Sequence, residues 1–305
     1  MAATSTPAEG SALRSFLAEE MGEDVETGAE ASEEKAGTGE AYTRPNGMVY
    51  VGRQVPRNEA GIRDDVGLLK ELRKAGVFPR LMSAPGTGKT AAMEAAFGDE
   101  LITVVCGEGT DEDSLVGGHR PRPGGEWEWV DGPVTKAMLE GRPLLLDEFA
   151  AAHPRVQSRL NGVFDGRLEL QLPEKDGGAV VRAAEGFWAA VAYNPGPHFE
   201  LSDAMASRFA LPIRYTTDLS VARGIGIPEK AVKLTRRLRR MVSAGEASWV
   251  PEMRELVAFK NHEVLLGETW AVGALIGAAP EECREEVAAA CGEVFCGIAG
   301  KELEL

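Results

Sequence analysis

The chain has 305 residues, 44% of them hydrophobic, which is enough to bury a sizeable core in one large domain or in a larger and a smaller one. Its net charge of −15 argues against sequence-independent binding to nucleic acid, because that binding needs cations to displace phosphate counterions. No apolar run reaches the roughly eighteen residues of a membrane span, and the first residues lack a signal-peptide pattern. We therefore expect a cytoplasmic protein without a membrane segment.

The first 40 residues are strongly acidic, with ten acidic side chains against Arg14 and Lys35. They are rich in Ala, Gly, Ser, Thr and Glu, a composition that cannot bury enough apolar surface to order itself. We expect a disordered acidic tail over residues 1–45. Four apolar residues within it fall at helical spacing, and they form either a weakly helical patch or a segment that docks on a partner or neighbouring subunit. These residues are Leu13, Phe16, Leu17 and Met21.

Predicted elements begin near Tyr50, with a helix expected over 64–75 and an apolar strand over 77–83. The strand leads into the sequence Ser83-Ala84-Pro85-Gly86-Thr87-Gly88-Lys89-Thr90, and a helix-prone stretch follows over 91–96. Strand, glycine-rich turn and helix in this order are what a phosphate-binding loop needs. The segment predicts a site for a nucleotide phosphate. The alternative is a glycine-rich surface turn that happens to hold a lysine.

The residue types of this loop suit an anion. Glycines let backbone N–H groups converge on phosphate oxygens, and the dipole of the new helix favours the same charge. Lys89 is expected to reach the β- and γ-phosphates, and the Thr90 hydroxyl to bind Mg²⁺. Ser83 replaces the first glycine of the strict pattern, and we expect it to tighten the turn less well without abolishing binding. The predicted phosphate-binding residues are Pro85, Gly86, Thr87, Gly88, Lys89 and Thr90.

Four elements are expected between this loop and the next motif: a strand over 101–106, a loop-like segment over 107–125, a hairpin strand over 126–130 and a helix over 133–140. An apolar run over 144–146 then ends in Asp147 and Glu148, and a continuous apolar run fits a parallel strand buried on both faces. Asp147 is expected to hold magnesium through water, and Glu148 to polarise the attacking water. An ordinary strand end capped by acids is the alternative, and the phosphate loop upstream favours the functional interpretation.

Further along the chain we expect a helix over 155–164 and strands over 167–172 and 187–193. Asn194 follows the last strand, where it is either a turn former or, beside the acidic strand, a group that orients the lytic water or touches the γ-phosphate. Arg208 ends a short helix too far along to reach its own nucleotide easily. Supplied from a neighbouring subunit, such an arginine would stabilise the transition-state charge.

Strands that alternate with helices predict an α/β fold, with a parallel sheet and helices on both faces. No strand pattern remains after about Asp218, so we expect the last third to be a helical domain. The expected division is a tail over 1–45, an α/β domain over 46–217 and a helical domain over 218–305. The four cysteines form no C-x-x-C pair, which favours buried reduced thiols over a metal site or disulfides.

The order of these motifs resembles the AAA+ ATPases, specifically the MoxR-type branch. The loop over 83–90 looks like a Walker A motif, 144–148 like Walker B, Asn194 like sensor 1 and Arg208, in Ser-Arg-Phe, like an arginine finger. The sequence Tyr-Asn-Pro-Gly over 193–196, followed by that Ser-Arg-Phe, is similar to the CbbQ and NorQ subgroup. The segments 113–117, 129–133 and 153–157 also look familial, and the resemblance spans roughly residues 50–286.

This resemblance implies a P-loop NTPase core with a C-terminal helical lid, and ATP and Mg²⁺ as cofactors. It implies a homo-oligomeric ring, a hexamer in this branch, that hydrolyses ATP to remodel or activate a client protein, often with a von Willebrand A-type adaptor. The start of the lid helix over 251–256 resembles sensor 2, which makes Arg254 a candidate γ-phosphate contact or else a surface salt-bridging residue. Trp127 and Trp129 either grip the client in a central pore or pack within their hairpin.

Two other functions remain open from the residues alone. A ring motor directed at nucleic acid, using GTP or ATP, would share the phosphate loop, although the acidic surface counts against it. A P-loop kinase of small molecules would not need Arg208 from a neighbour or a long helical lid. A crowded basic run over 230–240 is either a solvated helix face or a surface that meets an acidic neighbour or the tail.

Overall fold

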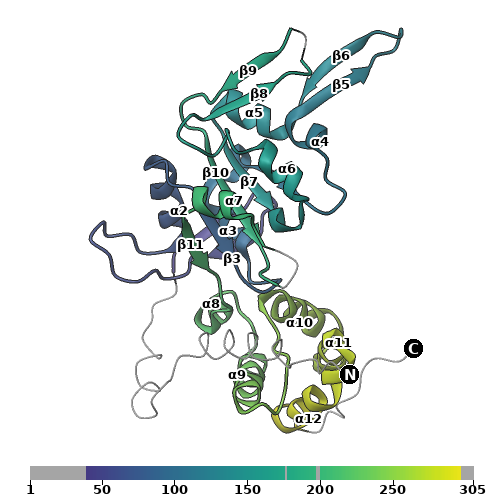
Figure 1. Ribbon diagram of the computed structural model, residues 1–305. Coiled ribbons are helices and arrows are strands. Elements are labelled where there is room, and N and C mark those ends of the chain that lie inside the picture. The colour runs from purple at the N-terminus through teal and green to yellow at the C-terminus, as the bar shows by residue number, and fades with distance from the viewer. Residues whose placement is uncertain (1–38, 176, 197–199, 297–305) are drawn as a thin grey trace, which may run out of the picture.

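The computed structural model describes residues 39–175, 177–196 and 200–296, in which an α/β domain precedes a C-terminal helical region (Figure 1). The apolar patch predicted in the acidic tail lies outside the described residues. Strand β1 (Ala41–Thr43) pairs antiparallel with β2 (Val49–Val51), so strand structure begins inside the segment expected to be tail.

The centre of the α/β domain is a five-stranded sheet with the order β11-β3-β10-β7-β4. All of its neighbouring strands are parallel, so the carboxyl ends of β3, β10 and β7 lie at one edge of the sheet. The strands are β3 (Pro79–Met82), β4 (Ile102–Val105), β7 (Pro143–Asp147), β10 (Trp188–Tyr193) and β11 (Leu211–Arg214). Strand β11 was not predicted, because it is a short, half-buried edge strand and contains Pro212, a residue that weakens a strand pattern.

Alternate residues of the central strands enter two separate apolar clusters. Leu144 and Leu146 of β7 belong to one cluster and Leu145 to the other. The first cluster includes side chains of α5 (Pro133–Glu140), α6 (Pro154–Arg159) and α7 (Asp203–Arg208), and the second those of α2 (Asp65–Lys74) and α3 (Lys89–Phe97). Both faces of the sheet are therefore covered by helices, which confirms the predicted fold class.

Two antiparallel hairpins extend from the end of the α/β domain that is opposite to the helical region (Figure 1). One consists of β5 (Gly117–Pro121) and β6 (Trp127–Asp131), and the other of β8 (Glu169–Leu172) and β9 (Ala179–Arg182). The prediction of a loop over 107–125 was wrong, because this segment forms α4 (Glu112–Val116) and then β5. The side chain of Asp111 caps α4 by accepting from the Ser114 N–H, a local signal that sequence reasoning missed.

The helix predicted over 155–164 is shorter than expected. Helix α6 ends at Arg159, and the N–H groups of Leu160, Asn161 and Val163 then bond to the third residue before each of them. Such bonds form tight turns instead of α-helix. Among the described residues, three short 3₁₀ helices complete the secondary structure: η2 (Gly98–Glu100), η3 (Phe149–Ala151) and η4 (Glu281–Cys283).

The described residues after Asp218 form helices joined by short loops and contain no strand, as predicted. The helices are α8 (Leu219–Gly224), α9 (Glu229–Ala244), α10 (Met253–Leu266), α11 (Glu268–Ala278) and α12 (Arg284–Val294). They share a third apolar cluster, which is separate from the two clusters of the sheet. The basic run of α9 is partly neutralised, because Lys230 pairs with Glu268 and Arg237 with Glu293. Within the described part of the chain, no helix is both long and apolar enough to cross a membrane.

The four cysteines form no disulfide in the structure. Cys106, Cys283 and Cys291 are buried as expected, whereas Cys296 is exposed, so the expectation of burial was wrong for that residue. Burial raises the pKa of the Cys106 and Cys291 thiols to about 12, because a thiolate is poorly solvated there.

Candidate active site

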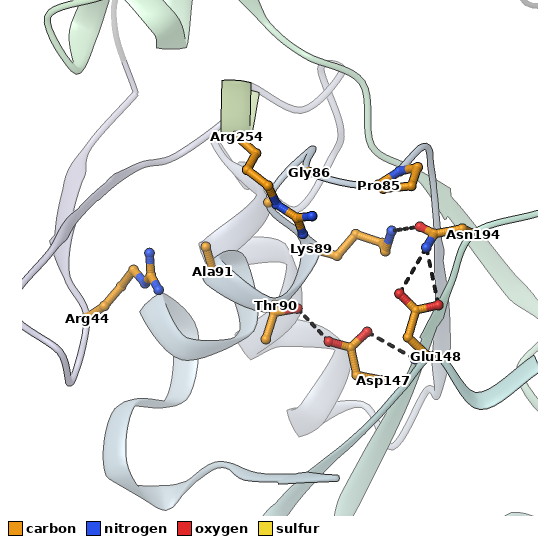
Figure 2. A pocket seen from close by; sticks show the side chains of 11 residues that line it. Arg44, Pro85, Gly86, Lys89, Thr90, Ala91, Asp147, Glu148, Asn194 and Arg254 are labelled. Atoms are coloured by element: carbon orange, nitrogen blue, oxygen red, sulfur yellow. Dashed lines mark hydrogen bonds between the residues drawn. The ribbon is translucent and has the colours of Figure 1, made fainter. Parts of the chain in front are cut away.

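A cavity of about 280 Å³ opens at the carboxyl edge of the sheet, where β3, β7 and β10 end (Figure 2). Its walls come from the loop between β3 and α3, from the ends of β7 and β10, from the start of α10 and from the β1–β2 hairpin. The lining residues are Arg44, Pro85, Gly86, Gly88, Lys89, Thr90, Ala91, Asp147, Glu148, Asn194 and Arg254. Of the predicted site residues, only Thr87 and Arg208 are not among them.

The loop backbone has the conformation that an anion site requires. Gly86 and Gly88 adopt φ angles of 84° and 99°, in the left-handed region that favours glycine. Helix α3 begins directly after Gly88, and no side chain caps its first turn. The first N–H groups of that helix are therefore left for an external acceptor, and the helix dipole attracts a negative one.

Ser83 has a role that the sequence did not reveal. Its hydroxyl accepts a hydrogen bond from Lys89 Nζ at 2.8 Å, lies 2.5 Å from Thr87 Oγ1 and donates to the Ala84 carbonyl at 2.9 Å. The substitution of serine for the usual glycine therefore provides a contact for the lysine, in addition to any effect on the turn. Thr87 itself is buried behind the loop, where its carbonyl accepts from Arg53.

A chain of hydrogen bonds connects the loop to the ends of β7 and β10. Lys89 Nζ donates to Asn194 Oδ1 at 2.7 Å, and Asn194 Nδ2 donates to both carboxylate oxygens of Glu148, at 2.9 and 3.2 Å (Figure 2). Burial lowers the pKa of Lys89, while the nearby charges of Asp147 and Glu148 act in the opposite direction. A buried ammonium group with few solvent contacts is suited to receive the charge of a phosphate.

The backbone at Glu148 explains how two consecutive acids line the same cavity. Successive residues of a strand point to opposite faces of the sheet. Glu148 leaves the strand with a φ angle of 55°, which is rare for a residue other than glycine and costs on the order of 1–3 kcal/mol. The surrounding structure holds this conformation, since Ala151 N–H donates to the Glu148 carbonyl and Asn194 binds its carboxylate.

Two oxygen donors that suit magnesium are in direct contact. Thr90 Oγ1 donates to Asp147 Oδ2 at 2.7 Å. Mg²⁺ prefers hard oxygen ligands, keeps several waters and is usually held by one or two carboxylates together with substrate phosphates. One hydroxyl and one carboxylate beside the phosphate loop therefore fit this ion.

Arg254 brings the helical region to the cavity. Its backbone N–H donates to the Gly86 carbonyl at 3.1 Å, and its side chain lies over the loop (Figure 2). A reciprocal capping box between Glu252 and Glu255 starts helix α10 at this point. The crowding is tight, because a Cβ added at Gly86 would lie 2.9 Å from the Cβ of Arg254.

Arg208 lies away from the cavity, at the end of α7. Its Nε donates to the Asn161 carbonyl at 3.1 Å and its Nη1 to the Ala204 carbonyl at 2.6 Å. Asp165 lies 4.0 Å from its Nη2. These contacts are with the turns that follow α6 and with its own helix, and the side chain remains 23% exposed.

The two tryptophans of the β5–β6 hairpin differ in their surroundings. Trp129 is half-buried, donates from Nε1 to Asp131 at 2.7 Å and packs edge-on against His119. Trp127 is 67% exposed. Packing within the hairpin therefore accounts for Trp129 and not for Trp127.

Sequence reasoning missed Arg44 and Ala91 as lining residues. Ala91 follows the motif directly, so its position could have been inferred from the first turn of the helix. Arg44 precedes Lys89 by 45 positions, within a segment expected to be tail, and only tertiary structure brings the two together.

Comparisons with known proteins agree with this geometry. The family model described as AAA domain (dynein-related subfamily) matches residues 81–209, which include the loop, both acids, Asn194 and Arg208. NorQ of Paracoccus denitrificans (strain Pd 1222) is 35% identical over 158 residues, which cover 50% of this chain and 55% of NorQ. An uncharacterised protein of Staphylococcus haemolyticus (strain JCSC1435) is 32% identical over 188 residues, which cover 55% of this chain and 71% of that protein.

The match to NorQ thus spans about half of the length of that relative. Among solved structures, a crystal structure from Cytophaga hutchinsonii ATCC 33406 aligns with a TM-score of 0.40 and 16% identity, over 73% of this chain and 82% of that one.

Proposed function

Because the chain belongs to the MoxR-type AAA+ ATPases, we propose that it hydrolyses ATP with Mg²⁺, as a ring of about six subunits, to remodel or activate a partner protein. The observation that carries the ATPase part is the hydrogen-bonded set at one cavity, with Lys89 on Asn194, Asn194 on Glu148, and Thr90 on Asp147. Each of these side chains has a distinct task in phosphoryl transfer.

The proposed mechanism divides the work between the loop and the strand ends. Backbone N–H groups of the loop and the Lys89 ammonium bind the phosphates, and the γ-phosphate replaces Ser83 and Asn194 as the partner of the lysine. Glu148 accepts the proton of the attacking water, and Asn194 holds that carboxylate in place. Thr90 and Asp147 would hold a magnesium ion, which would supply positive charge to the phosphate oxygens.

The ring part of the proposal rests on Arg208. The cavity of one subunit contains no side chain from α7, yet the transition state of phosphoryl transfer benefits from an arginine near the γ-phosphate. We propose that Arg208 reaches the cavity of a neighbouring subunit, so that hydrolysis is coupled to movement between subunits. The client protein, with or without a von Willebrand A-type adaptor, would then be acted on at the centre of the ring, where the exposed Trp127 is available for contact.

Substitution of Glu148 by glutamine tests the hydrolysis step. The change removes the water-polarising carboxylate and keeps Asp147, so ATP should still bind while turnover falls about a hundredfold or more. Turnover is measured as phosphate release and affinity by calorimetry. Equal losses of binding and turnover would mean that Glu148 has a structural role instead of a catalytic one.

The same variant tests the ring and the client. Glu148→Gln with ATP and magnesium should form rings by light scattering, and proteins that co-purify with it are candidate clients. A panel of ATP and GTP, with and without DNA, separates this function from a motor directed at nucleic acid. A monomer that hydrolyses ATP at full rate, or turnover that depends on DNA, would contradict the proposal.

A further inference from the structure

One wall of the cavity is formed by a residue that no motif predicts. Arg44 lies in the turn between β1 and β2, where its backbone N–H donates to the Met48 carbonyl at 2.9 Å. Its side chain reaches the first turns of α3, beside Ala91 (Figure 2).

The order of the side chains along the cavity indicates which part of a bound nucleotide faces Arg44. Glu148 and Asn194 mark the end where the γ-phosphate is attacked, if the chain binds ATP as proposed above. Arg44 and Ala91 lie on the opposite side of the α3 N-terminus from them (Figure 2). A nucleotide whose γ-phosphate lies at Glu148 must extend away from it, so its base and ribose point toward the Arg44 end.

A carboxylate on the next turn of α3 holds the guanidinium of Arg44. Glu94 Oε2 accepts from Arg44 Nε at 2.8 Å and lies 2.7 Å from its Nη2. The side chains are only 17% and 30% exposed, so this pair is more rigid than an ordinary surface pair. The edge formed by Nε and Nη2 is therefore occupied, while the planar face of the group is not used by these bonds.

The charge of the Glu94 carboxylate also determines which part of a nucleotide can bind beside Arg44. Its negative charge offsets that of Arg44 and would repel a phosphate group placed beside it. A purine ring carries no such charge, and a guanidinium plane stacks well on aromatic rings. We propose that Arg44 binds the base of the nucleotide by stacking on the purine ring, with Glu94 fixing the orientation of the plane.

This inference rests on the proposed function, and it adds a base-binding residue to the same site. Stacking makes little distinction between purines, because each has a π-face. Recognition at this wall should therefore be similar for ATP and GTP.

Calorimetry with ATP, GTP and inorganic tripolyphosphate, in the full chain with magnesium, tests the assignment. Arg44→Ala should weaken ATP and GTP about tenfold, as expected for loss of one stacking contact, and should leave tripolyphosphate unchanged. Arg44→Lys keeps the charge but lacks the plane, so it should not restore the affinity. Arg63→Ala, at an exposed arginine of the same N-terminal segment, is the matched control and should behave as wild type.

Unchanged tripolyphosphate binding also shows that the variant is folded and that its phosphate loop is intact. Equal losses for ATP and tripolyphosphate, or full rescue by Arg44→Lys, would overturn the proposal in favour of a phosphate contact. Wild-type ATP affinity in Arg44→Ala would overturn it as well. Lys89→Ala separates failure of this inference from failure of the proposed function. If the phosphate loop did not bind ATP, Lys89→Ala would bind ATP as tightly as wild type does.

Discussion

The α/β domain and the helical region each carry an arginine that a triphosphate could use, and the two residues are placed in opposite ways. Arg208 belongs to the domain that builds the cavity, yet its guanidinium contacts a carbonyl in the turns after α6 and one of its own helix. Arg254 belongs to the other region, yet it lines the cavity (Figure 2). A side chain of the nucleotide-binding domain is thus directed away from the nucleotide site, while the separate helical region supplies one.

This difference indicates two routes by which the site is completed. Arg254 can act on the nucleotide of its own chain, because a backbone hydrogen bond to Gly86 already places it at the loop. Arg208 does not line the cavity of its own chain, and on the proposal above it acts on the cavity of another copy. On this proposal, hydrolysis would be sensed within the chain through Arg254 and between chains through Arg208.

The largest effect is expected for the contact between chains. Arg208→Ala should keep ATP affinity near that of wild type and lower turnover about a thousandfold, the low end for loss of an arginine finger. Phosphate release and calorimetry measure the two quantities. A large loss of affinity instead would place Arg208 in its own site and remove the contrast with Arg254.

Mixing variants provides the control for this prediction. A ring that contains Lys89→Ala and Arg208→Ala subunits has some interfaces at which an intact Lys89 meets an intact Arg208. Such a ring should recover part of the activity. If the mixture is as inactive as its components despite verified co-assembly, Arg208 does not act between subunits.

Two buried thiols report separately on the two regions. Cys106 follows β4 in the α/β domain, and Cys291 lies in α12 of the helical region. Their raised pKa of about 12 keeps both protonated and unreactive at pH 8 in the closed protein, so alkylation requires local opening. ATP at about 100 times its Kd stabilises the binding-competent state by about 2.7 kcal/mol, so both thiols should react about a hundredfold more slowly.

Exposed Cys296 should react at the same rate with and without ATP, and it serves as the internal standard. Protection of Cys106 without protection of Cys291 would mean that the helical region does not respond to the nucleotide.

The dependence of protein stability on pH has a defined sign. Thiols with a pKa of 9.0 when exposed and about 12 when buried ionise first in the opened state, so stability should decrease as the pH rises from 9 toward 12.

The sequence was sufficient for the parts of the fold that repeat a strong pattern. Strand β7 is a continuous apolar run because both of its faces are covered, and helix α5 begins at proline and ends before glycine. Strand β9 and helix α4 are too short to establish a period, and edge strand β11 is half-buried, so their patterns were too weak to predict.

The same distinction applies to the site. Lys89, Thr90, Asp147 and Glu148 could be predicted because each follows a strand or turn whose local sequence fixes its place. Arg44 could not, because its place depends on the folding of a distant hairpin against α3. The contact of Ser83 with Lys89 was also beyond the motif, which specifies a residue type and not the partner of its side chain.

The smallest effect on ATP binding and hydrolysis is expected at Arg254, where the helical region contacts the phosphate loop. Arg254→Ala should weaken ATP binding about tenfold, because one charge-assisted contact to a phosphate is worth about 1.5–3 kcal/mol and solvent can partly replace it. Its backbone hydrogen bond to Gly86 does not depend on the side chain, so helix α10 should keep its position and the ATP-free protein its thermal stability.

The thiol experiment makes this last prediction specific to the coupling of the two regions. If the Arg254 side chain connects the nucleotide to the helical region, Arg254→Ala at saturating ATP should still protect Cys106 but protect Cys291 less than wild type does. Arg284→Ala, in α12 and away from the cavity, is the control for loss of an arginine from the helical region. An equal loss of protection at both thiols would show that Arg254 contributes to affinity alone, and that the helical region follows the nucleotide through the backbone contact at Gly86.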